Sequence, residues 1–554
     1  MRVARLVAVA LLLAPGCRYS ATDTVQLVKE SGVQRLRDDL RPIRGTTRVL
    51  VVAFDGVGAG VLEEALEAGH LPPLTTLAGP HRRGPRYEHA YLARDVLSIL
   101  PSTTMAAWSS VYTGEGPAET GVPGNEWFDR ANDAYRAPAP VSVSGHAHAS
   151  AIYTDGWLGA QIEVPTVFER ADVRAHVSLA PVHRGADVLT TPEALDAVQM
   201  LSILPAGLVG EHGVSEEAYR ALDEDAIDEA LTAIDRHGLP DLQVLYFPGV
   251  DLLAHSREEP LREQREHLRD VIAPGLQRVL ARYRRDKALE HTYVLVISDH
   301  GHTPTPHDEA HALSVTDEDA DPPAALRAAG FRVRAPQLEV PGGADHSAVV
   351  AYQGGMAYVY LADRSTCPDE GDACDWRQPP RFEADVLEAA RAFDSSTRDG
   401  TPVAGLEGRL EMVLARRPVP LDETPRPFSV FDGDRLVPVD AWLDAHPQPD
   451  WVRVSERLRD LAVGPHGHRA GDLLLISRLG RAIPHSDRTY FSGPYHSWHG
   501  SPSRQDSEIA LMALHMDRSG RELQRLVDDV LGPSRSQLRI TPLILRMLAA
   551  TGAH

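Results

Sequence analysis

The chain has 554 residues, 43% of them hydrophobic and 24% charged, which is the balance of a folded globular protein rather than a disordered one. This length allows one large α/β domain with insertions, or two domains. The formal net charge of −22 argues against a general nucleic-acid binder, because such proteins hold the phosphate backbone with a surplus of lysine and arginine. It does not exclude a small phosphate substrate, because bound metal ions can supply positive charge locally.

The first 17 residues have the pattern of an export signal. Two arginines flank a short apolar run, Leu6–Leu13, which is followed by the segment APGC ending at Cys17. The run is too short to span a bilayer and has the length of a signal-peptide core. A cysteine after a small residue is typical of a bacterial lipoprotein cleavage site, although Ala14 stands where leucine is usual. We therefore predict an exported protein, either a periplasmic or outer-membrane lipoprotein attached to the membrane only through Cys17, or a secreted protein.

A polar segment over residues 18–46 carries no strong strand pattern and is predicted to be a tether. After it, three apolar runs rich in β-branched residues predict strands that are buried on both faces of a parallel sheet. These runs are Arg48–Phe54, Leu242–Phe247 and Tyr293–Ile297. Charged helical segments lie on either side of the second run and fit the outer helices of an α/β fold. We predict a mostly parallel central sheet flanked by helices.

Acidic and histidine side chains follow each of these three strands. Asp55 follows the first strand, Asp251 and His255 follow the second, and Asp299 and His300 follow the third. A spacing of four residues puts Asp251 and His255 on one face of a helical turn. Open α/β sheets place their ligand sites at the carboxyl ends of the strands. Because carboxylate and imidazole together are a usual ligand set for zinc, these residues predict a metal site at that edge.

A cluster of hydroxyl residues lies between the first two of these strands. Ser102, Thr103 and Thr104 precede an apolar stretch that closes in Thr113-Gly114. This pattern predicts a helix with a capped N-terminus, and a hydroxyl there points into a place that favours anions. Simple capping by Thr103 or Thr104 is the alternative interpretation. Farther along, Asn125 follows a glycine and, taken alone, predicts a turn.

The amino-acid composition changes between residues 318 and 468. Proline, arginine and aspartate become more frequent there, and the predicted helices are shorter. Gly355–Leu361 predicts a strand, and Asp432-Gly433 is a hairpin signal. We predict a cap subdomain over 318–468, inserted between two parts of the core at 47–317 and 469–554. The run Gly471–Ser477 is expected to return to the core.

Cys367 and Cys374 are the two cysteines that remain besides Cys17. They lie close together in a loop of a chain that we expect to be exported, so a small disulfide is predicted. A structural zinc site is less favoured here, because no second pair of cysteines could complete it.

Taken in order and in their strand context, these motifs resemble the alkaline phosphatase superfamily. They are most similar to its type I phosphodiesterase/nucleotide pyrophosphatase branch, over about residues 49–514. The resemblance implies that the metal-bound nucleophile is Thr104, counted back from Thr113-Gly114, with Thr103 and Ser102 as alternatives. It also implies that Asn125 donates to a non-bridging phosphate oxygen. Met105–Trp108 departs from the Phe-Pro-Asn-His that usually follows the nucleophile in this branch.

The resemblance further implies two zinc ions per chain. One is held by Asp251, His255 and His499, and the other by Asp55, Asp299, His300 and the oxygen of Thr104. The last histidine of the family precedes a glycine and, after a polar stretch, an apolar strand. His499-Gly500 before Glu508–Leu514 fits this order; His496 is the alternative, and His466 and His468 are more distant ones.

These assignments predict a metal-dependent hydrolase that acts on a small phosphate ester through a phosphothreonine intermediate. Diesters are expected to be better substrates than monoesters, because no lysine or arginine is evident around Thr104 or Asn125. An alkaline phosphomonoesterase or a phosphonate hydrolase of the same fold is the alternative. A surface lipoprotein that binds without catalysing is the alternative from another class. The oligomeric state does not follow from the sequence.

Overall fold

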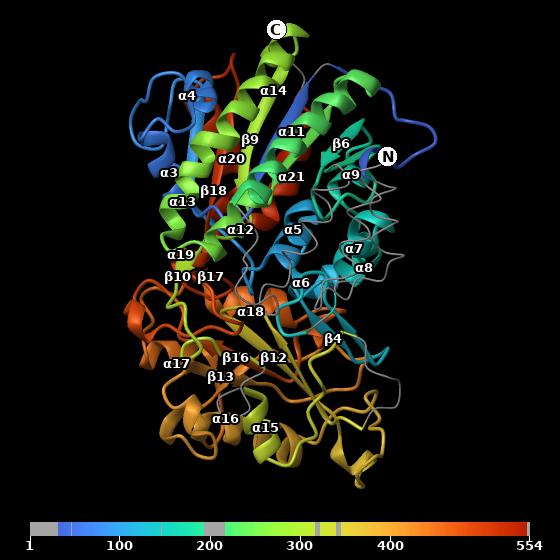
Figure 1. The fold of residues 1–554 in the computed structure, drawn as a ribbon, viewed down its shortest axis with the longest axis vertical. Helices are drawn as coiled ribbons and strands as arrows, with labels where there is room; N and C mark the ends of the chain where they lie inside the picture. Colours follow the sequence, from blue (N-terminus) through green and yellow to red (C-terminus); the bar gives the residue numbers. More distant parts are fainter. Residues whose placement is uncertain are drawn as a thin grey trace.

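The computed structural model describes residues 31–45, 47–143, 145, 147–192, 216–315, 322–338 and 345–550. The predicted signal segment, with Cys17, lies outside these residues. Figure 1 shows two sheets stacked along the long axis, a large one in the upper half and a smaller one in the lower half. Within the described residues, no helix combines the length and the apolar character that a membrane span needs.

The large sheet has eight strands and confirms the predicted α/β fold. Five neighbouring strands are parallel, and each strand beyond them pairs antiparallel with its neighbour. In spatial order the strands are β1 (Gly32–Arg35), β7 (Val188–Thr191), β6 (Ala175–Ser178), β8 (Leu242–Phe247), β2 (Arg48–Phe54), β9 (Thr292–Ser298), β18 (Glu508–Leu514) and β3 (Ala90–Leu97). The three apolar runs predicted from the sequence are therefore the adjacent strands β8, β2 and β9.

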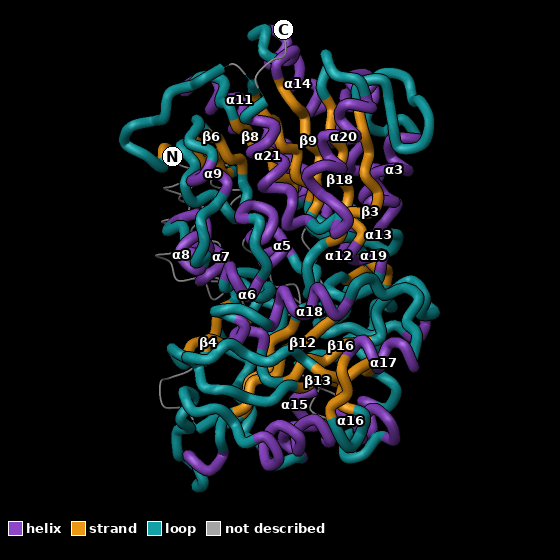
Figure 2. Tube along the Cα trace, turned by 180° about the vertical axis from the view of Figure 1, so that it is seen from behind, coloured by secondary structure: helices purple, strands orange, loops and turns teal. Residues whose placement is uncertain are grey.

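Helices cover both faces of this sheet, which is why its central strands are apolar throughout. Along β2, Leu50 and Val52 pack on one face, and Val49 and Val51 pack on the other. The first face is covered by α3 (Ala59–Glu67), α4 (Pro72–Ala78), α11 (Glu216–His237), α13 (Pro260–His267) and α14 (Ala273–Arg285). The second face is covered by α5 (Thr104–Thr113), α20 (Gly520–Leu531) and α21 (Ile540–Leu548), seen from behind in Figure 2. Burying one such aliphatic side chain stabilises the fold by roughly 1.5–3 kcal/mol.

The smaller sheet has six antiparallel strands and contains most of the predicted cap. Its order is β11 (Ala348–Tyr352), β12 (Met356–Leu361), β16 (Leu473–Ser477), β13 (Leu410–Ala415), β14 (Ser429–Phe431) and β15 (Leu436–Pro438). The predicted strand at 355–361 and the hairpin at Asp432-Gly433 are both present, as β12 and β14–β15. Helices α15 (Pro322–Ala328) and α16 (Leu387–Asp399) pack against it.

Two segment assignments from the sequence were wrong. The run 471–477, expected in the core, contains β16, which pairs with β12 and β13 in the smaller sheet. An apolar run that is buried on both faces fits the interior of either sheet, so its composition does not identify its neighbours. The predicted tether at 18–46 contains β1, which pairs with the edge strand β7. Backbone hydrogen bonds hold this strand, so it needs no apolar pattern.

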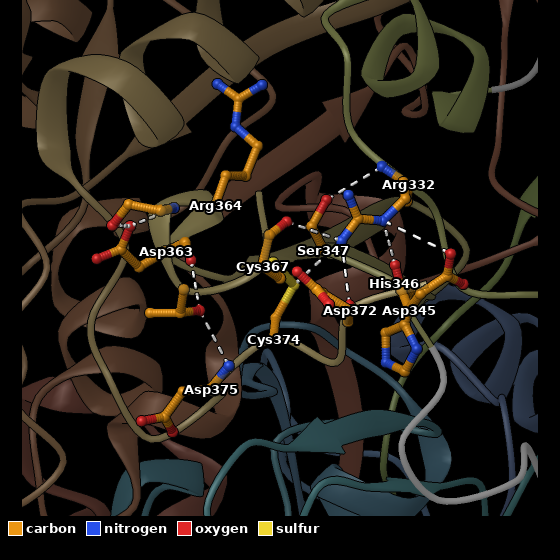
Figure 3. The surroundings of a disulfide bond; sticks show 12 residues. Arg332, Asp345, His346, Ser347, Asp363, Arg364, Cys367, Asp372, Cys374 and Asp375 are labelled. Atoms are coloured by element: carbon orange, nitrogen blue, oxygen red, sulfur yellow. Dashed lines mark hydrogen bonds and ion pairs between the residues drawn. A yellow bond between two sulfur atoms is a disulfide. The ribbon is translucent and has the colours of Figure 1, made fainter. Parts of the chain in front are cut away.

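The predicted disulfide between Cys367 and Cys374 is present and is shown in Figure 3. The guanidinium of Arg332 lies beside it and donates from Nη2 to the backbone oxygens of Cys367, at 3.1 Å, and Asp372, at 3.3 Å. The bridge and this arginine together close the loop after β12.

Candidate metal centre

The strand-end residues predicted from the sequence meet at one edge of the large sheet. Asp55 follows β2, and Asp299 and His300 follow β9; Asp251 and His255 lie in α12 (Gly249–Ser256), which begins just after β8. These three strands are adjacent and parallel, so their carboxyl ends converge. His499 reaches the same place from the segment after β17 (Ser497–Trp498). All six side chains are buried.

One set of atoms surrounds the Nε2 atom of His300. Asp55 Oδ1, Asp299 Oδ2 and Thr104 Oγ1 each lie 3.3 Å from it. The two carboxylate oxygens are buried and have no hydrogen-bond partner. Zinc–ligand bonds of about 2.0–2.2 Å in a tetrahedral arrangement separate two ligand atoms by about 3.3 Å. The four residues therefore fit as ligands of a single ion.

A second set surrounds Asp251. Its Oδ2 atom lies 3.4 Å from His255 Nε2, and its Oδ1 atom lies 3.8 Å from His499 Nε2. Asp251 Oδ1 is also 4.0 Å from His300 Nε2, so the two sets are neighbours. These three residues are the ones that the sequence assigned to the other ion.

Backbone carbonyls orient the histidine rings of both sets. His255 Nδ1 lies 2.8 Å from the oxygen of Ser497, and His499 Nδ1 lies 2.9 Å from the oxygen of Ser102. His300 Nδ1 lies 3.2 Å from the oxygen of Gly301. A carbonyl only accepts, so each Nδ1 carries the proton and each Nε2 turns its lone pair into the cluster. This is how proteins fix the tautomer of a metal-binding histidine.

The electrostatics of the cluster favour the binding of a cation. Burial, followed by the negative charge of Asp251, raises the pKa of Asp55. Burial and the charge of Asp55 hold the pKa of Asp299 well above its ordinary value. Burial would lower the pKa of His300, but Asp299 and Asp55 raise it to about 10. Without metal, the buried carboxylates thus favour a proton on His300 Nε2; divalent ions would supply the missing positive charge and take the place of that proton.

His302 is a site residue that the sequence reasoning missed. Its Nε2 atom lies 2.7 Å from Asp251 Oδ1, and its Nδ1 atom lies 2.9 Å from Ser497 Oγ. With Asp251 and His255 it forms another group that could hold a metal. The glycine at position 56 makes room for it, because a Cβ atom there would lie 2.6 Å from His302 Nε2. The sequence feature that could have identified His302 is its place two positions after the predicted ligand His300.

The hydroxyl cluster lies at the N-terminus of α5. Thr104 is the first residue of the helix, and its Oγ1 atom contacts His300 as described above. Thr103 occupies the N-cap position but makes no side-chain capping bond, and Ser102 Oγ donates to the oxygen of Ser501 at 3.3 Å. Of the three hydroxyl groups, that of Thr104 is the one that touches a candidate metal ligand.

Asn125 lies against the start of the same helix. Its side-chain oxygen accepts from the backbone N–H of Met105 at 3.0 Å, and its own N–H donates to Gln353 Oε1 at 2.7 Å. Asn125 thus caps the first turn of α5 from another segment, through the N–H of the residue that follows Thr104. A residue that the sequence alone predicts as a turn therefore lies at the helix end that carries the candidate nucleophile.

The alternative last ligands lie outside the cluster. His496 stacks on His307 with ring centroids 4.1 Å apart, and the Nε2 atom of His468 lies 2.9 Å from the oxygen of Glu423. Neither belongs to a group of side chains that could hold a metal within the described residues, and the same is true of His466.

A parallel-centred α/β sheet that gathers buried carboxylates, imidazoles and a helix-terminal hydroxyl at one edge is the architecture of a metal-dependent hydrolase. The family model for type I phosphodiesterase/nucleotide pyrophosphatase matches residues 49–366, more than half of the chain, and the chain belongs to this family. It is therefore a metal-dependent phosphoric ester hydrolase of the alkaline phosphatase superfamily, as the sequence motifs predicted.

Solved structures of similar proteins have low sequence identity. Murine ectonucleotide pyrophosphatase/phosphodiesterase 5, an inactive variant in complex with AMP, is 13% identical, with 92% of this chain and 96% of that chain covered and a TM-score of 0.49. Phosphonoacetate hydrolase from Sinorhizobium meliloti 1021, in complex with phosphonoformate, is 16% identical, with 93% and 100% covered and a TM-score of 0.47. The human ectonucleotide pyrophosphatase/phosphodiesterase 5 is 11% identical, with 92% and 96% covered and a TM-score of 0.45. No curated protein matches the sequence.

Proposed function

We propose that the protein is a two-zinc phosphodiesterase that forms a phosphothreonine intermediate on Thr104. The observation that carries this proposal is the placing of Thr104 Oγ1, Asp55 Oδ1 and Asp299 Oδ2 at 3.3 Å from one imidazole nitrogen. Three protein ligands around one point, with the nucleophile oxygen in the fourth position, are typical of a catalytic rather than a structural zinc site.

When bound, the two ions supply positive charge for the attacking and the leaving oxygen of an in-line displacement. The side chains of the protein hold the ions and supply the nucleophile. Asp55, Asp299 and His300 hold one ion beside Thr104, and Asp251, His255 and His499 hold the other. Thr104 attacks phosphorus, the alcohol departs, and water then hydrolyses the phosphothreonine.

The start of α5 binds the phosphate group in this proposal. The N-terminus of this ten-residue helix favours an anion. Because the side-chain oxygen of Asn125 accepts from the N–H of Met105, its NH₂ group is the part of the side chain that would donate to a non-bridging phosphate oxygen. In the described part of the chain, the hydrogen bonds of Thr104 and Asn125 involve no lysine or arginine. Such a site suits the single charge of a diester better than the double charge of a monoester.

The substrate assay compares four nitrophenyl compounds on one preparation: a phosphodiester, a phosphomonoester, a phosphonate monoester and a sulfate. We expect the diester to be hydrolysed fastest, with activity lost on chelation and restored by zinc. Faster turnover of the monoester would mean that the protein is a phosphomonoesterase rather than a phosphodiesterase. Faster turnover of the phosphonate monoester would mean that the protein is a phosphonate hydrolase of the same fold.

We also propose that the protein is exported. The apolar run before Cys17 supports a mature chain that begins at a lipid-modified Cys17 in the periplasm or outer membrane. Intact-mass analysis of the membrane fraction should show the acyl chains, and Cys17→Ser should abolish them. A soluble periplasmic protein that lacks the modification would favour plain secretion.

A further inference from the structure

Asp506 is a buried carboxylate that belongs to neither proposed metal site. It lies in the short helix α19 (Arg504–Ser507), between the segment of His499 and strand β18, and none of its surface is exposed. A carboxylate in such a place needs donors for both of its oxygens. Burial raises the pKa of Asp506 to about 6, and hydrogen bonds from Ser501 and Thr303 oppose that rise.

The donors come from the two segments that carry the metal-binding histidines. Thr303 Oγ1 donates to Asp506 Oδ1 at 2.6 Å, and Thr303 follows His300 by three positions. Ser501 donates to Asp506 Oδ2 from its Oγ atom at 2.6 Å and from its N–H at 3.1 Å, and Ser501 follows His499 by two positions. One carboxylate therefore links a segment of the first proposed site to a segment of the second.

Other contacts also join these segments, and one is the 2.9 Å contact between His302 Nδ1 and Ser497 Oγ. The ladder between β10 (Thr303–Pro304) and β17 has two residue pairs. The N–H of Gly301 donates to the backbone oxygen of Asp506 at 2.9 Å. A Cβ atom at Gly301 would lie 2.1 Å from the oxygen of Gln505, so α19 packs directly on the turn after His300. Asp506 therefore contacts that turn with both its side chain and its backbone.

The same network reaches the nucleophile. Ser102, two positions before Thr104, accepts a bond from His499 Nδ1 at 2.9 Å through its backbone oxygen. Its own hydroxyl donates to the oxygen of Ser501 at 3.3 Å. A displacement of the Ser501 segment would therefore also displace the loop that leads into Thr104.

We propose that Asp506 is a positioning residue that fixes the distance between His300 and His499, and thereby the spacing of the two metal ions. The proposal rests on the proposed function, in which each histidine binds a different ion. The two imidazole rings are stacked, with centroids 3.6 Å apart. A two-metal displacement needs ions roughly 3.5–4 Å apart, so a small shift of one segment against the other would impair it.

The first test uses Asp506→Asn, which is nearly isosteric and leaves every proposed ligand in place. The amide puts an NH₂ group where one carboxylate oxygen accepts, so either Thr303 or Ser501 loses its acceptor. We expect the variant to bind two zinc ions whose metal–metal signal in X-ray absorption spectra is longer or broader than in the wild type. Its kcat should fall by about 10- to 100-fold, with KM nearly unchanged. A folded variant with two ions at the wild-type spacing and full kcat would overturn the proposal.

The matched pair is Thr303→Val and Thr303→Ser. Valine removes the hydroxyl at constant shape and should reproduce the defect in part, whereas serine keeps the hydroxyl and should restore kcat. If the bond between Thr303 and Asp506 only stabilised the fold, Thr303→Val would lower the thermal stability and leave the kcat of the folded protein unchanged. That result would also count against a positioning role.

A second measurement does not depend on metal. In the metal-free protein, Asp506→Asn should accelerate amide hydrogen exchange in segments 300–303 and 497–501 together, because it uncouples both. Faster exchange in one segment alone, or in neither, would contradict the proposed link. Wild-type protein that binds fewer than two ions would instead refute the proposed function, while the exchange result would still decide the coupling.

Discussion

The Nε2 atom of His302 and the Oδ1 atom of Asp251 lie 2.7 Å apart, which is a hydrogen-bond distance and is shorter than a pair of ligands on one tetrahedral zinc ion allows. The other nitrogen–oxygen pairs around the proposed ions lie at 3.3 to 4.0 Å. We infer that His302 binds the carboxylate rather than the metal. With Ser497 on its other nitrogen, it holds Asp251 so that Oδ2 faces His255.

His302→Ala should weaken zinc binding by about 10- to 100-fold without removing either ion at saturating zinc. The reason is that Asp251 loses the donor that orients it but remains a ligand. Isothermal titration of metal-free protein measures the change, and Ser497→Ala, which removes the support of the ring, should give a smaller effect of the same sign. Loss of one ion at saturation would mean that His302 is a ligand itself.

Thr104→Ala should retain the fold and lose at least about 1,000-fold in kcat, because within the described residues no other hydroxyl has a recorded hydrogen bond to the imidazole of His300. Thr104→Ser should keep part of the activity. The matched control is Thr103→Val, an isosteric change at a side chain that makes no capping bond. Rapid acid quenching followed by peptide mass spectrometry should find the phosphoryl group on Thr104. A label on Ser102 or Thr103 would refute the assignment.

Metal removal should destabilise the protein, and Asp299→Asn should show why. At a free zinc concentration of 1,000 times the dissociation constant, one ion adds about 4 kcal/mol to the free energy of unfolding. In the metal-free protein, burial and Asp55 hold the pKa of Asp299 high, so its ionised form is unfavourable. The neutral amide should therefore leave the metal-free protein as stable as the wild type or more so, while abolishing the stabilisation by zinc. Thermal unfolding with and without chelator measures both. A metal-free variant less stable than metal-free wild type would contradict this account.

Much of this centre could be predicted from the sequence because strand-end residues are fixed by the sheet itself. Once β2, β8 and β9 are recognised as adjacent parallel strands, Asp55, Asp251 and Asp299 must lie near one another. His302 was harder, since a histidine two positions after a ligand can point elsewhere, and its role depends on Ser497, far away in the chain. Asp506 has no motif at all, because its donors come from two distant segments. The place of β16 also depends on long-range pairing.

Asp187 should make stability depend on pH at the edge of the large sheet. Burial would raise the pKa of Asp187, but hydrogen bonds from Arg41, whose Nη2 lies 2.7 Å from Oδ2, and from the N–H of Ala175 lower it. A carboxyl with a lowered folded pKa stabilises fully above its unfolded pKa, near about 4, and loses that contribution as the pH falls through the folded value. Asp187→Asn should cost roughly 3–5 kcal/mol at pH 7, because the guanidinium of Arg41 loses the negative charge that balances it.

Denaturant unfolding at a series of pH values measures the difference between Asp187→Asn and the wild type. The difference should be constant between about pH 6 and 8 and should shrink below about pH 4. A difference that grows as the pH falls would reverse the sign and exclude Asp187 as the source. Arg41→Met, which removes the charge but keeps much of the stem, should resemble Asp187→Asn at neutral pH.

His499 and His496 provide the sharpest test of the ligand set, because they lie three positions apart in very different surroundings. His499 is buried, has its Nδ1 atom on the oxygen of Ser102 and turns Nε2 toward Asp251 at 3.8 Å. His496 is only partly buried and stacks on His307. His499→Ala should therefore reduce the zinc content from about two ions to one and abolish turnover. His496→Ala should keep both ions and most of the activity. Metal analysis of the two purified variants decides between them, and loss of an ion from His496→Ala with retention in His499→Ala would exchange their roles.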